Sequence, residues 1–295
     1  MAGVLAIFFL LLSSAGAAPP PYPAPGKLID LGGYRVHLYC TGQGSPTVMI
    51  VGGFSFDWAL VQPEIAKSTR VCTYDAAGTA WSDTRPAMTC RDRAAEIHKL
   101  LQAAGIGGPY VLVGYSIGGL ITRLYAAQYR TEVAGLVIVD HAFLPGKSHP
   151  PPPPPPQGPD SPPVLISSVP IVLNMEDDVN FSKLPERDRQ LQLWAASASP
   201  QRPTAADAAE CISELEATRP QQAGALSEIP LVVVSTTRHS DDYAKLQASL
   251  LLLSRHSRQL IADNSSHFVE IDRPDVIVSA IRQVIAAVRD HTSLQ

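Results

Sequence analysis

Basic residues are few in this sequence and form no cluster. Lys and Arg together make up 23 of the 295 residues, and the formal net charge is −4. Proteins that hold nucleic acid by its phosphates, or that bind anionic lipid headgroups, need a basic patch or stripe. The charge balance therefore argues against a nucleic-acid partner and against a basic membrane-binding face, and it leaves the substrate open.

Metal-binding spacings are also lacking. The four cysteines, Cys40, Cys72, Cys90 and Cys211, match none of the patterns of metal sites. Four cysteines in an exported chain can instead form up to two disulfides, in three possible connectivities. A buried free thiol at each position is the alternative.

The first residues lack Lys and Arg, and their apolar run is too short to cross a bilayer. This run, Leu5 to Leu12, is followed by two serines and the small residues Ala15 to Ala18, which is typical of a secretory signal with its cleavage site. We predict a signal peptide over residues 1–17 and a proline-rich linker over residues 18–26, and hence a secreted, periplasmic or cell-envelope protein. An uncleaved anchor, which would place the protein at a membrane, and a plain apolar tail are the alternatives.

Short apolar runs alternate with amphipathic runs over most of the chain, which is 45% hydrophobic. This alternation predicts an α/β fold with an eight-stranded, mostly parallel sheet flanked by helices. The predicted strands cover residues 28–31, 35–39, 47–51, 70–74, 110–113, 134–139, 231–234 and 259–261, the first two as an antiparallel hairpin. The predicted helices cover residues 57–67, 91–104, 117–129, 241–254 and 275–288.

The alternation stops between residues 142 and 227. This interruption predicts a cap or lid insertion that divides the core into residues 27–141 and 228–295. Its proline-rich loop, residues 150–163, begins with seven consecutive prolines and cannot add a strand, because proline lacks the backbone donor. We interpret the loop as an extended surface spacer; a docking ligand for a proline-recognising domain is the alternative.

Two helical stretches complete the predicted insertion, around residues 184–196 and 205–216. They could roof a site and supply its acyl or alcohol pocket, with the side chains of Leu191, Leu193 and Trp194 as candidate apolar lining. Ordinary packing faces are the alternative.

The most informative motif is Gly114-Tyr115-Ser116-Ile117-Gly118. An apolar run, residues 109–113, enters it, and an amphipathic run, residues 120–129, leaves it. A tight strand-to-helix turn of this kind strains the central residue and exposes it, while side chains at the two glycines would collide with neighbouring backbone. The Ser116 hydroxyl would then lie near a helix N-terminus, where developing negative charge is favoured. The motif predicts a nucleophile; a glycine-rich turn without chemistry is the alternative.

Several strings in this order resemble the α/β-hydrolase family, specifically its single-domain esterase-like members. Besides the motif around Ser116, they are Pro46 to Phe54, Arg70 to Asp75 with Gly78 and Trp81-Ser82-Asp83, and Ser266-His267-Phe268 followed by Asp272-Arg273-Pro274. The resemblance runs from about Arg35 to Ala280 outside the insertion. It departs from the family at Ala76, where a longer side chain, often Arg, is usual, and at Tyr115, where His is more frequent. In the implied fold Cys40 and Cys72 lie on adjacent strands and could face each other.

The resemblance implies a catalytic triad in the chain order serine, acid, histidine. His267 follows the last predicted strand and is the expected general base for Ser116, while His141 and His239 are candidates for supporting positions.

The sequence offers two positions for the acid of the triad. Asp140 closes the predicted strand 134–139, and some relatives place the triad acid there. Asp241 and Asp242 follow the strand 231–234 at a short distance, nearer the usual family position, but could instead cap the next helix.

The resemblance also implies an oxyanion hole made by the backbone N–H groups of Ile117 and Phe54. We therefore expect an exported serine hydrolase that cleaves small-molecule carboxylic esters through an acyl-enzyme on Ser116. This function implies neither a metal nor an organic cofactor. Acyltransferase or peroxidase activity on the same triad, and a non-catalytic binding protein with the same fold, are the alternatives. The sequence makes no prediction of oligomeric state.

Overall fold

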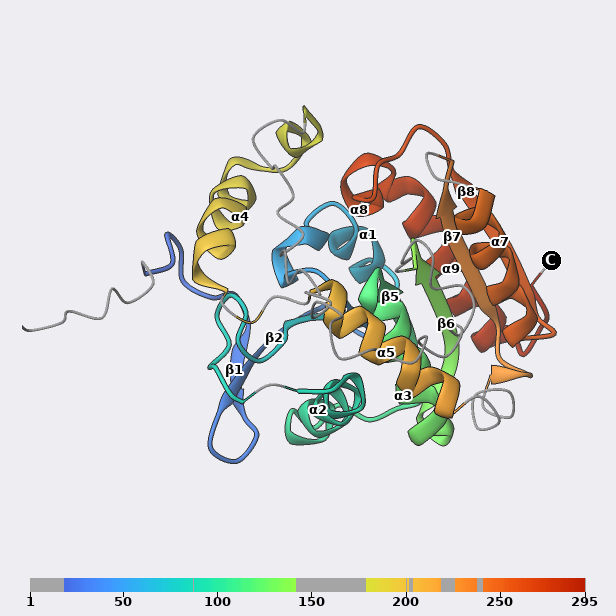
Figure 1. The fold of residues 1–295 in the computed structure, drawn as a ribbon, viewed down its shortest axis with the longest axis horizontal. Helices are drawn as coiled ribbons and strands as arrows, with labels where there is room; N and C mark the ends of the chain where they lie inside the picture. Colours follow the sequence, from blue (N-terminus) through green and yellow to red (C-terminus); the bar gives the residue numbers. More distant parts are fainter. Residues whose placement is uncertain are drawn as a thin grey trace, which may run out of the picture.

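Eight strands form one sheet in the computed structural model, which describes residues 19–86, 88–141, 179–199, 201, 204–218, 226–237 and 241–294 (Figure 1). The strands are β1 (Lys27–Asp30), β2 (Arg35–Thr41), β3 (Thr47–Val51), β4 (Val71–Asp75), β5 (Tyr110–Tyr115), β6 (Val133–Val139), β7 (Leu231–Thr236) and β8 (Ser257–Ala262). Their order is β1-β2-β4-β3-β5-β6-β7-β8. The pairs β1–β2 and β2–β4 are antiparallel and the other five pairs are parallel, so the predicted eight-stranded, mostly parallel sheet is confirmed.

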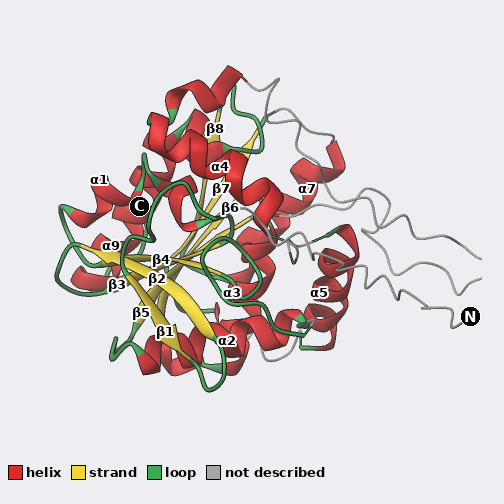
Figure 2. Ribbon diagram, turned by 90° about the vertical axis from the view of Figure 1, so that its left-hand side faces the viewer, coloured by secondary structure: helices red, strands yellow, loops and turns green. Residues whose placement is uncertain are grey.

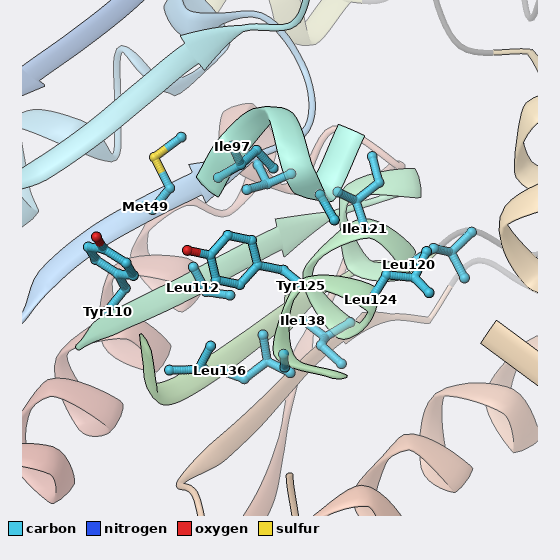
Figure 3. Close-up of a cluster of buried hydrophobic side chains, with 14 of the residues drawn as sticks. Met49, Ile97, Tyr110, Leu112, Leu120, Ile121, Leu124, Tyr125, Leu136 and Ile138 are labelled. Atoms are coloured by element: carbon cyan, nitrogen blue, oxygen red, sulfur yellow. The ribbon is translucent and has the colours of Figure 1, made fainter. Parts of the chain in front are cut away.

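The central strands are buried on both faces because helices cover each side of the sheet. Every residue of β3, β5 and β7 is buried, as their nearly continuous apolar sequences require. Successive residues belong to opposite cores: Leu112 packs in one hydrophobic cluster, and Val111 and Val113 pack in the other. Figure 3 shows the first cluster, in which Leu112 lies with Leu124 and Tyr125.

Helices form the two outer layers (Figure 2). α2 (Cys90–Ala103) and α3 (Ile117–Gln128) cover one face, and α1 (Gln62–Ala66) and α9 (Pro274–Asp290) cover the other. The remaining helices are α4 (Glu186–Ala198), α5 (Ala205–Ala217), α7 (Asp241–Ser249) and α8 (Val269–Asp272), with short 3-10 turns η1 (Ser55–Trp58), η2 (Arg130–Glu132), η3 (Val179–Lys183) and η4 (Leu250–Leu253).

Two predicted helices are interrupted. The prediction over residues 57–67 was wrong as one helix, because η1 ends at Trp58 and α1 begins at Gln62. Pro63 lies in the first turn of α1, where its missing N–H costs nothing, so the helix starts anew there. The predicted helix 241–254 ends as α7 at Ser249 and continues as η4.

The described part of the predicted insertion divides into two helices with different surroundings. α5 packs against α2 and α3, and its residues Cys211 and Leu215 belong to the main core, which fits an ordinary packing face. α4 packs instead on η1, where Leu191 is fully buried while Leu193 is 59% exposed. The predicted signal peptide (1–17), the proline-rich loop (150–163) and His239 lie outside the described residues, and export stays a prediction.

Two disulfides account for the four cysteines. Cys40 and Cys72 are directly opposite each other on β2 and β4, with 4.0 Å between their Cα atoms, as the implied fold predicted. Cys90 at the start of α2 is bonded to Cys211 of α5, 121 residues later. Among the described residues, none of the helices is long and apolar enough to cross a membrane.

Candidate active site

Ser116 lies at the turn between β5 and α3 in a conformation that L-residues rarely adopt. Its φ is +53° and its ψ is −122°. The turn is possible only because glycine stands on both sides: an added Cβ at Gly118 would overlap the carbonyl oxygen of Val51, and one at Gly114 would overlap the backbone of Gly118 and Gly119. The backbone strain fixes the Ser116 side chain at the edge of the sheet where the parallel strands end.

The structure brings Ser116, His267 and Asp140 together. His267 Nε2 is 3.0 Å from Ser116 Oγ, and His267 Nδ1 is 2.5 Å from Asp140 Oδ2. An ionised carboxylate can only accept, so Nδ1 carries the proton and the lone pair of Nε2 faces the serine hydroxyl. This arrangement allows the imidazole to take the proton of Ser116 when the oxygen attacks a carbonyl.

Asp140 is the acid that contacts His267, and a tyrosine holds it. It follows β6 directly, has a positive φ of +41° and is 1% exposed. The Tyr243 hydroxyl of α7 donates to Asp140 Oδ1 and accepts the backbone N–H of Thr236 at 3.2 Å. Burial and the Asp140 charge raise the pKa of Tyr243, which keeps its hydroxyl protonated for this bond.

The other candidate acids lie away from the imidazole. Asp241 and Asp242 are exposed in the first turn of α7, and Asp242 is 3.4 Å from Lys245. The residue that reaches the site from this turn is Tyr243, which no sequence motif identified. His141 follows Asp140, and its ring nitrogen Nε2 lies 3.3 Å from the guanidinium of Arg123 on α3.

The two expected oxyanion donors differ in their surroundings. Ile117 is the first residue of α3, so its N–H has no acceptor within the helix. The Phe54 N–H instead donates to the side chain of Asp57, with 2.7 Å between N and Oδ2. Gly52 and Gly53, with φ of +112° and +71°, create the tight turn that brings this backbone beside β5.

The aspartate–histidine pair beside the elbow serine uses the buried Asp140, one of the two positions that the sequence left open. A family model agrees with the resemblance found in the sequence. The model, described as the alpha/beta hydrolase fold, matches residues 46–274. The chain belongs to the α/β-hydrolase fold family.

This α/β-hydrolase is similar to one relative along most of its length and to another along less than half of it. It is 25% identical over 261 residues to the uncharacterized protein YqjL of Bacillus subtilis, covering 83% of this chain and 86% of that protein. It is 35% identical over 133 residues to the 2-hydroxymuconate semialdehyde hydrolase of Pseudomonas sp. strain CF600, covering 42% of this chain and 46% of that hydrolase. A solved thermophilic esterase from Thermogutta terrifontis has 21% identity and a TM-score of 0.62, with 86% of this chain and 94% of the esterase covered. These similarities confirm the fold class and support a hydrolase.

The turn that carries His267 is fastened on both sides. The Tyr115 hydroxyl donates to the carbonyl oxygen of His267 at 3.1 Å, so the tyrosine that replaces the more frequent histidine holds the general-base candidate in place. Asp272 accepts the Ser266 N–H and hydroxyl at 2.8 and 2.7 Å. Asp272, the first residue of the Asp272-Arg273-Pro274 string, therefore stabilises the turn that carries His267.

Glu270 of α8, three residues after His267, is a buried acid. It is 0% exposed, and neither carboxyl oxygen has a hydrogen-bond partner among the described residues. Burial raises the pKa of Glu270 well above its usual range, and the nearby charges of Asp57, Asp140 and Asp272 raise it further. The pKa of Glu270 is higher in the folded than in the unfolded chain, so the folded protein holds a proton on Glu270 that the unfolded chain has already lost. The stability that this proton contributes is fully present below the pKa of the unfolded chain and is lost as the pH rises from there through the pKa of the folded protein.

Glu270→Gln is expected to stabilise the α/β-hydrolase at pH 8 and to have little effect near pH 4, because glutamine never has to ionise or to take up this proton. The expected gain in the free energy of unfolding at pH 8 is about 1 kcal/mol or more. Each kcal/mol raises the Tm of a protein of this size class by about 2–4 °C. Thermal melts at the two pH values measure it, with the exposed Glu210→Gln on α5 as the matched control. An equal shift at both pH values would contradict the assignment of a proton to Glu270.

Proposed function

We propose that this α/β-hydrolase is a serine hydrolase that cleaves carboxylic esters through an acyl-enzyme. The observation that carries the proposal is the continuous hydrogen-bonded chain from Ser116 Oγ through His267 to the buried Asp140. Its support is the combination of a strained elbow serine, an oriented imidazole and a carboxylate held by Tyr243, which are the parts that nucleophilic acyl transfer requires.

In the first half of the reaction, Ser116 Oγ attacks the ester carbonyl while His267 Nε2 takes its proton. Asp140 stabilises the imidazolium that forms and keeps the ring in the required tautomer. The Ile117 N–H at the start of α3 would stabilise the oxyanion of the tetrahedral intermediate, with the helix dipole behind it. The imidazolium then protonates the leaving alcohol, and the acyl group stays on Ser116.

In the second half, His267 Nε2 removes a proton from water, which attacks the acyl-enzyme. The acid leaves, and the proton returns to Ser116 Oγ. Every step uses groups of this chain, and the proposal includes no metal or organic cofactor. Esters are favoured over amides because an alcohol needs less assistance to leave than an amine does.

The test is covalent labelling with a fluorophosphonate probe combined with hydrolysis of a panel of p-nitrophenyl esters. We expect one label per chain, located by mass spectrometry on the peptide that contains Ser116, and release of acid and alcohol in equal amounts. Heat-denatured protein is the control for non-specific labelling. A folded protein that is neither labelled nor active on any ester would contradict the proposal and favour the non-catalytic binding protein; transfer of the acyl group to an added alcohol in preference to water would favour an acyltransferase.

A further inference from the structure

A pocket of about 430 Å³ lies between α4, η1, α1, β2 and the N-terminal segment, and the triad candidates do not line it. Its volume falls within the range of about 300–1,000 Å³ that is typical of small-molecule sites in proteins. The apolar part of its lining consists of Pro25, Phe56, Ala59, Pro63 and Ala66. The pocket is therefore suited to the apolar body of a small ligand.

Two contacts fix α4 at the margin of the fold, where it forms one wall of the pocket (Figure 1). Gln192 donates its side-chain amide to the buried Asp57 of η1. On the other side, the Tyr22 hydroxyl of the N-terminal segment donates to Gln190 Oε1 at 2.9 Å. None of these four residues belongs to the lining, so the wall is held in place by contacts that leave the pocket itself open.

The unusual group in the lining is the carboxylate of Asp188, in the first turn of α4. Asp188 is only 7% exposed, yet neither of its carboxylate oxygens has a hydrogen bond among the described residues. The guanidinium of Arg187 is 3.7 Å from Asp188 Oδ1, which is beyond hydrogen-bond distance, and it also lies 5.6 Å from the centre of the Tyr22 ring. Buried carboxylates are ordinarily paired and hydrogen-bonded, so Asp188 lacks the partners that its burial calls for.

The charge of Asp188 determines which ligands suit the pocket. Burial raises the pKa of Asp188, and the nearby charge of Arg187 lowers it in part. A cation in the pocket would stabilise the ionised carboxylate, whereas an anion would be repelled. A primary ammonium group has three N–H donors, and its hydrogen bonds to a carboxylate are among the strong ones. A metal ion is less well served, since in the described part of the chain no three His, Cys, Asp or Glu side chains are grouped to hold one.

We propose that this pocket binds a small primary amine, whose ammonium group donates to the Asp188 carboxylate while its apolar body packs on Phe56, Ala59 and Ala66. The carboxylate supplies the orientation and the apolar walls supply the contact area, which is the usual division in small-molecule sites. Amine binding here goes beyond the proposed ester hydrolysis and is independent of it, because no triad candidate lines the pocket.

The experiment is isothermal titration calorimetry with hexylammonium chloride, and with 1-hexanol as the uncharged counterpart. Wild type at pH 8 should bind hexylammonium at least about 10-fold more tightly than hexanol, because a hydrogen bond to a charged group contributes about 1.5–3 kcal/mol, which is about 10- to 100-fold in affinity. Asp188→Asn should lose this factor for hexylammonium and leave hexanol binding unchanged. Glu186→Gln is the matched control: it removes a charge from the same turn of α4, but its side chain is 62% exposed and should not affect either ligand.

The same titration at pH 4 tests the part played by the carboxylate. Hexylammonium stays charged at this pH, whereas a carboxyl group with a raised pKa gains a proton and can no longer attract the cation. Wild type should therefore bind hexylammonium more weakly at pH 4 than at pH 8, and Asp188→Asn should bind it equally at both. Amide shifts in ¹⁵N–¹H spectra should locate the ligand at Ser55, Gln62 and Asp188, which line the pocket.

Equal affinity of wild type for hexylammonium and hexanol, or an undiminished affinity in Asp188→Asn, would overturn the amine site. No binding to folded wild type at millimolar hexylammonium would overturn it as well. Should Asp188→Asn fail to fold, Ala66→Leu decides, because it fills the apolar part of the pocket, keeps Asp188 and should abolish binding. Fluorophosphonate labelling of the same proteins tests the proposed function separately, so either proposal can fail while the other stands.

Discussion

Alanine in place of Ser116 is expected to reduce kcat for ester hydrolysis by about a million-fold, the loss found when a triad nucleophile is removed from a serine hydrolase. The serine hydroxyl is the group that His267 Nε2 faces at 3.0 Å, and no acyl-enzyme can form without it. The remaining rate, about 1000- to 10,000-fold above that in water, would come from oxyanion stabilisation and binding alone. KM should change little, because the Ser116 Oγ contributes to the reaction more than to binding.

Steady-state kinetics with the best ester of the panel measure this loss, and intact-protein mass confirms the absence of an acyl intermediate. Ser279→Ala is the matched control, since Ser279 is exposed on α9 and bonds only its helix neighbour Gln283 among the described residues. A Ser116→Ala protein that keeps most of the activity would rule out Ser116 as the nucleophile.

Asparagine in place of Asp140 is expected to lower kcat by about 10,000-fold while leaving the fold intact. The reason lies in the two partners of the carboxylate. The Tyr243 hydroxyl donates to Oδ1, so an asparagine at this position would turn its carbonyl oxygen toward Tyr243 and its amide toward His267 Nδ1. The imidazole would then carry its proton on Nε2 and could not accept the proton of Ser116.

The double variant Asp241→Asn/Asp242→Asn is the control, because both side chains are exposed on α7 and should leave kcat unchanged. Loss of activity in this double variant together with an active Asp140→Asn enzyme would move the acid to α7. Circular dichroism melts of both proteins exclude unfolding as the cause.

Most of the sheet could be predicted because its central strands are apolar along most of their length and are separated by amphipathic helices. The nucleophile and base candidates were found because a glycine on each side of Ser116, and the turn around His267, leave a pattern in the sequence. The acid could not be chosen in this way. Asp140 and Asp241 both follow strands, and the choice depends on the direction that the backbone takes at Asp140 and on the Tyr243 hydroxyl, which are set by packing.

The contacts of the insertion could not be predicted either. The pairing of Cys90 with Cys211 joins residues 121 apart, and spacing alone leaves all three connectivities open. The bond between Gln192 and Asp57 depends on how α4 lies on η1, which neither helix sequence specifies. The break between η1 and α1 was missed by the prediction of one helix over residues 57–67, although Pro63, which favours a first helical turn, was a signal for it.

The Cys90–Cys211 disulfide also determines what a single backbone cut would do to this protein. Ser116 and Asp140 precede Cys211 in the chain and His267 follows it. A protease that cleaves anywhere between Asp140 and Cys211 would produce two polypeptides, one with the nucleophile and acid candidates and one with the base candidate, and the disulfide would keep them in one molecule. A nicked enzyme would therefore migrate as an intact chain on a gel until it is reduced, and its three triad candidates would remain covalently tethered to one another.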